Sequence, residues 1–403
     1  MHRYFPVDMG QLKSMIIVIL MLTSALTGCT SNGNENIVQI EINSPLEGDW
    51  IEGQVQISIT TKMTESEKIE IWINDNYHST EELGIVTDFD FDTSHFSDEN
   101  GSPVDLNIEL IYQNVSLTEV NVTALFPQQM TFWSSEDIQP EFNLAGELLF
   151  KSSKGLESSM YEIYHFDPGV TTPSKISTEQ EYHGYPGPSP DGTHVVFNSR
   201  VVDEAGILQM EIFTANISTG ETYRVTNSSS FDDSGRWGPD GSEIIFYSNR
   251  DGSMDLWKVS VNESGFPLEP PVKVMESDAR EHCGRWSFDG NYIIYEGDKT
   301  GVNHLWMITS DGLNETQLTF GEYQSRYPAW HPSGDYIVYN KETSTSSNLY
   351  ILSLLDGKTK RLTMHQMGVD AHPTWSADGK YIAFHSDRAG NFDIWIMEIP
   401  LTI

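Results

Sequence analysis

One hairpin motif recurs six times in the last two thirds of this 403-residue sequence, and it limits the possible fold more than any other feature. Each copy has a tight turn with a glycine, at Gly146, Gly192, Gly241, Gly290, Gly334 and Gly379. The copies are therefore 46, 49, 49, 44 and 45 residues apart, which is the spacing of β-propeller blades. Because one blade cannot bury both of its faces, the sequence predicts six blades that close into a ring.

Each copy has the pattern of four short strands around this turn. A tryptophan ends the first strand in four copies, where it can fill the wedge between neighbouring blades (Trp237, Trp286, Trp330 and Trp375). The last copy reaches only its third strand, at Ile399. We therefore expect the apolar segment at residues 130–133, ahead of the first copy, to supply the missing outer strand and to close the ring.

The segments WSADGKYIAFHSDRAGNFDIWIME and QLTFGEYQSRYPAW resemble the TolB-type propeller repeat. This resemblance covers roughly residues 140 to 400 and implies a six-bladed β-propeller, which we assign to residues 127–403. Members of the TolB-like group act in the cell envelope by docking partner proteins on the propeller. The resemblance therefore implies a binding role.

Residues 37–126 follow a different pattern. Polar and apolar residues alternate in short runs, for example at residues 55–59, 69–73 and 106–110, which is typical of strands with one buried face. Short strands without a helical stretch favour a β-sandwich, and their order resembles bacterial immunoglobulin-like modules. The expected fold class is all-β: a six-bladed β-propeller preceded by an immunoglobulin-like β-sandwich.

Residues 1–28 have the features of a lipoprotein signal peptide. Arg3 and Lys13 precede an apolar run at residues 15–26, which is shorter than the ~20 residues of a membrane-spanning helix. The run leads into Leu26-Thr27-Gly28-Cys29, which resembles the lipobox of prokaryotic lipoproteins. The resemblance implies that Cys29 is lipidated, with residues 29–36 as a flexible tether on the periplasmic or cell-surface side of a membrane. An ordinary signal peptide or an uncleaved anchor is the alternative.

The charge balance is strongly acidic, with 59 Asp and Glu against 23 Lys and Arg, a net charge of −36. Such a surface repels phosphate backbones, so nucleic acid is excluded as a partner class. The charge serves either solvation or the recognition of a basic partner or of divalent cations. Of the two cysteines, Cys283 stands alone if Cys29 is lipidated, which leaves no intramolecular disulfide.

Polar residues recur where the chain enters the first strand of each blade. Repetition should gather them around one mouth of the propeller, where loops commonly carry function. The candidate partner-binding residues are Asp137, His183, Asp232, Asp233, Arg236, Glu281, His282, Arg285, Arg326, Asp370 and His372. The alternative is that they are only solvated, or pair between adjacent blades. Imidazoles and carboxylates also suit a divalent metal, but His183, His282 and His372 stand at different offsets, which argues against a three-histidine metal site.

Catalytic motifs are absent from the sequence: there is no Gly-x-Ser-x-Gly elbow, no phosphate-binding glycine loop and no His-Glu-x-x-His. We therefore expect a monomeric, non-catalytic envelope lipoprotein without a cofactor, which binds a protein or peptide through the propeller mouth. The alternative is a metal-dependent carbohydrate lyase or hydrolase acting at that mouth. A third possibility is a structural protein whose propeller is a spacer.

Overall fold

The computed structural model describes residues 40–401, apart from residues 45–48, 53, 62–66, 84–85, 98–100, 113–114, 157–159, 170–171, 177, 179, 181, 203–205 and 366. The predicted signal peptide, the lipidation site Cys29 and the tether lie outside the described residues. The chain divides into two compact units, which are described separately. The first comprises Met1–Thr93 and Val104–Ala124, and the second comprises Ser94–Pro103 and Leu125–Ile403.

The first unit contains two sheets. The three-stranded sheet has the order β1-β3-β6 and the five-stranded sheet the order β2-β8-β7-β4-β5. Their bounds are β1 (Ile40–Ser44), β2 (Trp50–Ile51), β3 (Gln54–Thr61), β4 (Glu67–Ile73), β5 (Asn76–Leu83), β6 (Val86–Asp92), β7 (Val104–Tyr112) and β8 (Val115–Ala124). Alternate residues such as Ile69, Ile71 and Ile73 are buried, as the period-two pattern predicted. The two sheets form the expected β-sandwich.

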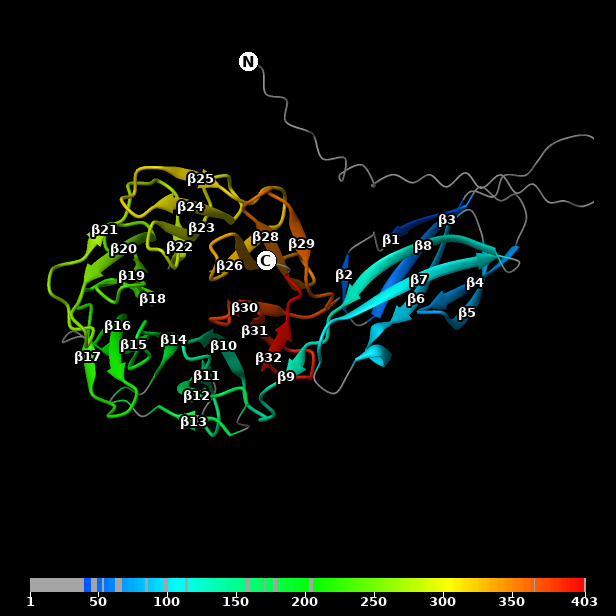
Figure 1. The fold of residues 1–403 in the computed structure, drawn as a ribbon. Coiled ribbons are helices and arrows are strands. Elements are labelled where there is room, and N and C mark those ends of the chain that lie inside the picture. The colour runs from blue at the N-terminus through cyan, green and yellow to red at the C-terminus, as the bar shows by residue number, and fades with distance from the viewer. Residues whose placement is uncertain are drawn as a thin grey trace, which may run out of the picture. The chain divides into compact units, whose positions relative to one another are not determined.

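The second unit is a six-bladed β-propeller, which confirms the predicted architecture. Six four-stranded sheets of the described chain stand around a common centre, with β10, β14, β18, β22, β26 and β30 innermost (Figure 1). Blade 1 contains β10 (Asp137–Phe142), β11 (Leu148–Ser152), β12 (Glu162–Phe166) and β13 (Ser174–Lys175). Blade 2 contains β14 (Gly184–Pro188), β15 (His194–Val202), β16 (Leu208–Asn216) and β17 (Thr222–Arg224). Blade 3 contains β18 (Asp232–Trp237), β19 (Glu243–Ser248), β20 (Asp255–Ser260) and β21 (Val272–Lys273).

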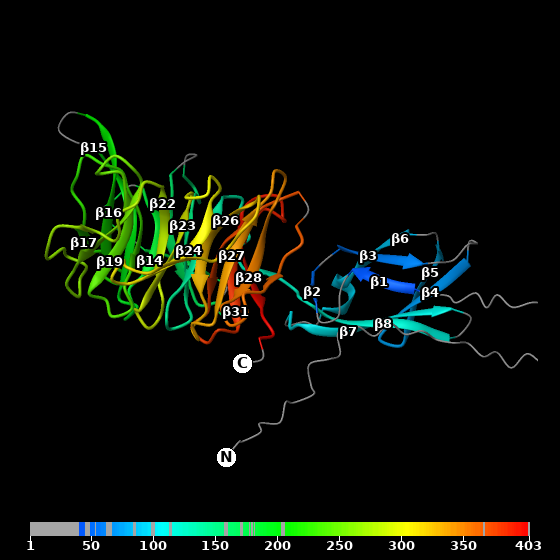
Figure 2. The same ribbon diagram turned by 90° about the horizontal axis from the view of Figure 1, so that it is seen from above.

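Blades 4 to 6 follow the same order, except that the last blade takes its outer strand from the beginning of the unit. Blade 4 contains β22 (Glu281–Trp286), β23 (Tyr292–Gly297), β24 (His304–Thr309) and β25 (Glu315–Gln317). Blade 5 contains β26 (Gln324–Trp330), β27 (Tyr336–Glu342), β28 (Ser347–Ser353) and β29 (Thr359–Arg361). Blade 6 contains β30 (Asp370–Trp375), β31 (Tyr381–Ser386), β32 (Asp393–Glu398) and β9 (Gln128–Gln129). Viewed edge-on, the long β15–β16 hairpin of blade 2 extends past the other blades (Figure 2).

The ring is closed by β9, which pairs antiparallel with β32. The sequence placed this strand at residues 130–133, two residues too late. Of that segment, the Met130 N–H donates to the Ile394 carbonyl at 2.7 Å, and the Thr131 hydroxyl donates to Asp393 at 3.1 Å. Phe132 is instead 74% exposed. The prediction failed in register because it followed apolar residues, whereas the strand itself consists of two glutamines.

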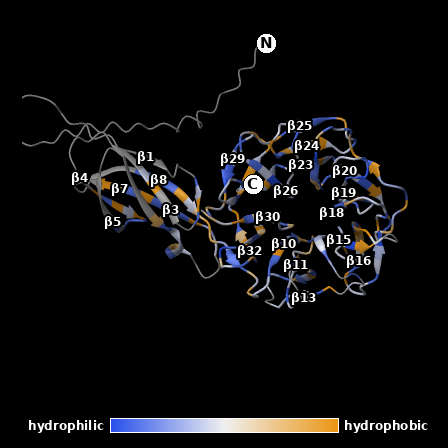
Figure 3. Cartoon of the chain, turned by 180° about the vertical axis from the view of Figure 1, so that it is seen from behind, coloured by the Kyte–Doolittle hydropathy of each residue, from blue (hydrophilic) through white to orange (hydrophobic). Residues whose placement is uncertain are grey.

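Hydrophobic side chains between neighbouring blades hold the ring together. Trp330 of blade 5 packs with Ile294 and Leu305 of blade 4, and Trp237 of blade 3 packs with Val196 of blade 2. The predicted role of these tryptophans as wedges is therefore confirmed. Apolar residues follow the central strands of the blades, such as β16, β19 and β20 (Figure 3).

Every innermost strand has a β-bulge at the same place. In each bulge one residue other than glycine has left-handed backbone, with φ between 48° and 57°: Gln139, Tyr185, Ser234, Cys283, Tyr327 and His372. Such a conformation costs on the order of 1–3 kcal/mol at each position. The bulge also changes the alternation of side chains along the strand, which decides which residues face the axis of the ring.

No helix among the described residues is long and apolar enough to cross a membrane.

Candidate functional site

Five of the predicted residues stand at the start of the innermost strands and are buried in the propeller. Asp137, His183, Asp232, Glu281 and Asp370 are all fully buried. Their partners come from the same blade, as for Asp232 with Arg250, or from the preceding blade, as for His183 with Tyr161 beside β12. None of the five residues contributes to the pocket described below. Their assignment as partner-binding residues therefore stays a prediction.

Two of the buried aspartates share one arrangement. Asp232 accepts a hydrogen bond from Arg250 at 2.9 Å, and Asp370 accepts from Arg388 at 2.9 Å. Each arginine follows the second strand of the same blade. Asp137 accepts from Ser152, the last residue of the second strand of blade 1, at 2.5 Å. These three contacts therefore tie strands of one blade together.

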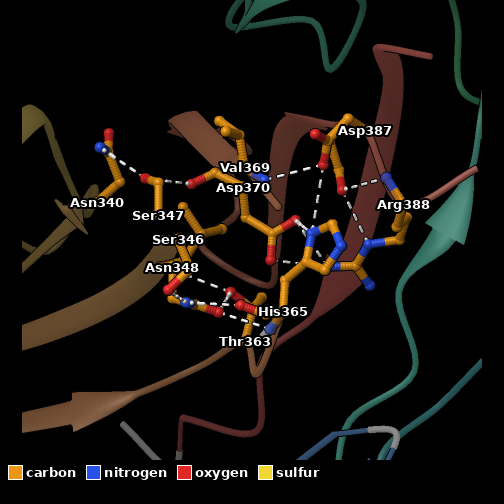
Figure 4. A network of polar contacts seen from close by, with 12 residues as sticks. Asn340, Ser346, Ser347, Asn348, Thr363, His365, Val369, Asp370, Asp387 and Arg388 are labelled. Carbon is orange, nitrogen blue, oxygen red and sulfur yellow. Dashed lines mark hydrogen bonds and ion pairs between the residues drawn. The ribbon is translucent and has the colours of Figure 1, made fainter. Parts of the chain in front are cut away.

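Asp370 is the centre of a polar network between blades 5 and 6 (Figure 4). His365 Nδ1 lies 3.6 Å from one Asp370 oxygen and 3.5 Å from one Asp387 oxygen. Burial opposes ionisation of Asp370, but His365 and Arg388 outweigh it and hold its pKa at about 2. The contact with Asp370 in turn raises the pKa of His365. The network is an internal ion cluster and does not form an open site.

The other two residues of this group have environments that favour their neutral forms. Burial raises the pKa of Glu281 to about 8, although Ser277 and Lys299 oppose the shift. Burial lowers the pKa of His183, whose Nδ1 lies 3.0 Å from the Tyr161 carbonyl oxygen. A neutral, enclosed side chain is a poor anchor for a charged ligand.

A second set of predicted residues lies one step further along the innermost strands. Asp233 accepts from the Tyr247 hydroxyl at 3.1 Å, and His282 packs edge-on against the Tyr247 ring at 5.0 Å. Arg326 donates from Nε to Glu296 at 3.1 Å. Burial raises the pKa of Asp233 to about 6. These residues already have protein partners.

Aromatic side chains fill the middle of the ring. His372 stacks on Tyr327 with ring centroids 3.5 Å apart, and Tyr185 lies 5.8 Å from the same imidazole. The space left among these side chains and Cys283 is about 10 Å³, about enough for one water molecule. Burial raises the pKa of the Cys283 thiol, which favours its inert, protonated form. These side chains therefore leave little open space along the axis at this level.

A pocket among the described residues opens at the other ends of the innermost strands, where the chain turns into the second strands. Its volume is about 250 Å³, and all six blades contribute to it. It is lined by Glu141, Phe142, Asn143, Leu144, Pro188, Ser189, Pro190, Arg236, Trp237, Gly238, Pro239, Arg285, Trp286, Ser287, Phe288, Ala329, Trp330, Thr374, Trp375 and Ala377. We call it the axial pocket.

Four polar side chains from four blades meet in the axial pocket. Glu141 of blade 1 accepts from Arg285 of blade 4 at 2.6 Å and from Thr374 of blade 6 at 3.1 Å. Its second oxygen lies 3.5 Å from Nη2 of Arg236, in blade 3. These contacts cross the centre of the ring, so the four residues form a polar cluster on the axis.

The polar cluster carries one positive charge in excess. Burial opposes ionisation of Glu141, but Arg285 and Arg236 outweigh it and lower its pKa. Burial, with repulsion from Arg285, lowers the pKa of Arg236 to about 10, which still leaves it protonated at neutral pH. Two guanidinium groups thus face one carboxylate. This excess is opposite in sign to the net charge of the whole chain.

Apolar side chains make the walls of the axial pocket. Trp237, Trp286, Trp330 and Trp375 line it, together with prolines that begin the turns. Leu144 and Phe288 are 56% and 44% exposed. A concave surface with apolar walls and a few convergent charged groups is the usual form of a ligand-binding site.

Of the eleven predicted residues, only Arg236 and Arg285 lie in the axial pocket. Sequence reasoning missed Glu141 and Thr374, although both stand five residues before the turn glycine of their blade, as the two arginines do. That shared offset was the available signal.

No group of three or more His, Cys, Asp or Glu side chains suited to a metal ion occurs among the residues that the structure describes. His183, His282 and His372 have different neighbours, as reported above. The predicted alternative of a metal-dependent lyase or hydrolase therefore has no such cluster to support it and stays a prediction.

The sequence also matches the family model described as the TolB beta propeller domain, over residues 171–343 and 322–400. The chain belongs to this family. No curated protein matches the sequence. A putative TolB from Agrobacterium tumefaciens has a similar structure, with a TM-score of 0.52 and 19% identity over 68% of this chain and 97% of its own. TolB from Acinetobacter baumannii has a TM-score of 0.53 and 17% identity, over 84% of this chain and 82% of its own. At these identities the likeness concerns the fold.

Proposed function

We propose that this TolB-family protein is a non-catalytic cell-envelope lipoprotein that binds a protein or peptide partner at the axis of its propeller. The axial pocket carries the proposal, because all six blades build it and it combines apolar walls with buried charges. A rigid ring supplies such a site without rearrangement, which lowers the entropic cost of binding.

The proposal places the partner at the end of the axis opposite to the predicted mouth. Of the predicted residues, Arg236 and Arg285 line the axial pocket. Asp232, which is buried and bonded to Arg250, stabilises its blade under this proposal.

Site-specific photo-crosslinking in cells that produce the full chain tests the binding role. A photoreactive residue in place of Phe288, at the pocket, should give one discrete adduct with an envelope protein. The same residue in place of Lys358, which lies on the exposed turn before β29, is the matched control. Equal adduct patterns from the two positions would contradict the proposal.

The lipid anchor needs a separate test, because Cys29 lies outside the described residues. Replacing Cys29 by serine should abolish incorporation of labelled palmitate and release the protein from the membrane fraction. Unchanged labelling of the Cys29→Ser variant would show that the anchor has been assigned wrongly.

A further inference from the structure

We infer that the axial pocket binds a single carboxylate carried on an apolar or aromatic residue, with Arg285 and Arg236 holding the carboxylate and the tryptophans enclosing the apolar part. This inference rests on the proposed binding function and specifies its ligand chemistry. A carboxylate next to an apolar side chain is found at the C-terminal end of a chain and at an aspartate or glutamate beside an apolar residue.

The donors in the pocket exceed the acceptors that the protein supplies. The Arg285 guanidinium donates to Glu141 through Nη1 and makes no other hydrogen bond among the described residues, although it has five N–H groups. Arg236 uses Nη1 for two backbone carbonyls, while its buried Nε has no partner. Unused guanidinium donors favour a planar acceptor such as a carboxylate, which they can bind in a bidentate way.

The charge of the polar cluster selects a monoanion. Two arginines and one ionised glutamate leave one positive charge, which one carboxylate neutralises. A phosphate group carries up to two negative charges and would leave the buried site negative, which a low-dielectric environment opposes. Glu141 therefore acts as an internal counter-charge that limits the site to singly charged ligands.

The size and walls of the pocket set the rest of the ligand. A pocket of about 250 Å³ holds one or two residues but not a folded domain. Indole walls favour an aromatic or large aliphatic side chain next to the carboxylate.

The acidic surface adds a condition on the rest of the partner. A net charge of −36 repels anions at long range, so an acidic partner would approach slowly. We therefore expect the carboxylate to belong to a neutral or basic partner, for which long-range attraction and local recognition act together.

Calorimetric titration of the purified protein with three short peptides tests the inference. The peptides are acetyl-Gly-Gly-Phe with a free carboxylate, its C-terminal amide, and acetyl-Gly-Glu-Phe-amide, which has only a side-chain carboxylate. We expect at least one acid to bind about tenfold or more tighter than the amide. The preferred acid identifies the source as a chain end or as an acidic side chain.

Variants of the polar cluster give the sharper readout. Arg285→Gln should remove most of the preference for acid over amide. Glu141→Gln removes the internal counter-charge, so it should tighten acid binding about tenfold and allow phenyl phosphate to bind. Arg361→Gln is the matched control and should leave binding unchanged. Arg361 is the last residue of the outer strand β29, and its Nε donates to the Thr363 carbonyl.

Folding of the variants is checked by thermal unfolding. If Arg285→Gln does not fold, the Glu141→Gln variant alone decides, because a purely structural cluster gives no gain in binding. Equal affinity for acid and amide, or weaker acid binding by Glu141→Gln, would overturn the inference and show that the cluster only braces the ring. In that case specific photo-crosslinks at position 288 would still support the proposed function, whereas their loss would count against it.

Discussion

At the scale of single residues, the buried charges of this protein mostly stabilise blades. His365 illustrates this role, because its imidazole lies within 3.6 Å of both Asp370 and Asp387. The predicted acids at the start of the innermost strands are buried in the same way, for example Asp232 beside Arg250. The offsets of those residues within the repeat were read correctly, but an offset does not tell whether a side chain faces the axis or its own blade.

The His365 contact should make stability depend on pH. The folded state raises the pKa of His365, so its contribution is present in full below about pH 6.5 and is lost as the pH rises through the raised value. Because His365 is partly exposed, we expect His365→Gln to cost about 0.5–1 kcal/mol at about pH 5.5 and much less at about pH 8.5. Urea unfolding at the two pH values measures this. A larger loss at the higher pH would contradict it.

Glu281 should also make stability fall as the pH rises, because the fold favours its neutral form. Burial raises its pKa to about 8, so the native state holds a proton that the unfolded chain releases above about pH 4.5. The folded protein should therefore lose stability as the pH rises from about 4.5 to about 8. Glu281→Gln should stabilise it by about 1–2 kcal/mol at about pH 8.5 and have little effect at about pH 4. An unchanged urea midpoint at high pH would show that Glu281 is ionised in the native state at little cost.

At the scale of elements, the repeated bulge separates what the sequence can predict from what it cannot. The spacing of turn glycines, the alternation of strands and the wedge position of Trp330 all follow directly from residue types. The bulge does not, because its left-handed residues are of five different types and none is glycine. Since the bulge decides which side chains reach the axis, the location of the site could not be predicted although Arg236 and Arg285 were identified.

The strain in the bulges should be measurable at Ser234, whose φ is 54°. Glycine adopts this backbone without a steric cost, so Ser234→Gly should raise stability by about 0.5–1 kcal/mol. Ser234→Val should lower it by about 2 kcal/mol, since a β-branched residue fits this conformation poorly. Thermal unfolding compares the two variants. A stabilising valine would show that the bulge is not strained.

At the scale of the whole molecule, the excess of 36 negative charges opposes the compact state through self-repulsion. Salt screens exposed charges over about 8–10 Å, while buried pairs such as Asp370 with Arg388 are screened much less. Raising NaCl from about 0.05 M to about 0.5 M should therefore increase the melting temperature. A decrease would mean that attractive surface pairs outweigh the repulsion.

The fastening of the ring has a mechanical consequence. Two residues of β9 join the last blade to the first, and they come directly after the N-terminal unit along the chain. A pull from the side of the proposed lipid anchor would reach this short strand before any complete blade. Tension should therefore detach β9 from β32 first and leave the six sheets folded but the circle open, so that the axial pocket, which needs all six blades, would loosen before the protein unfolds.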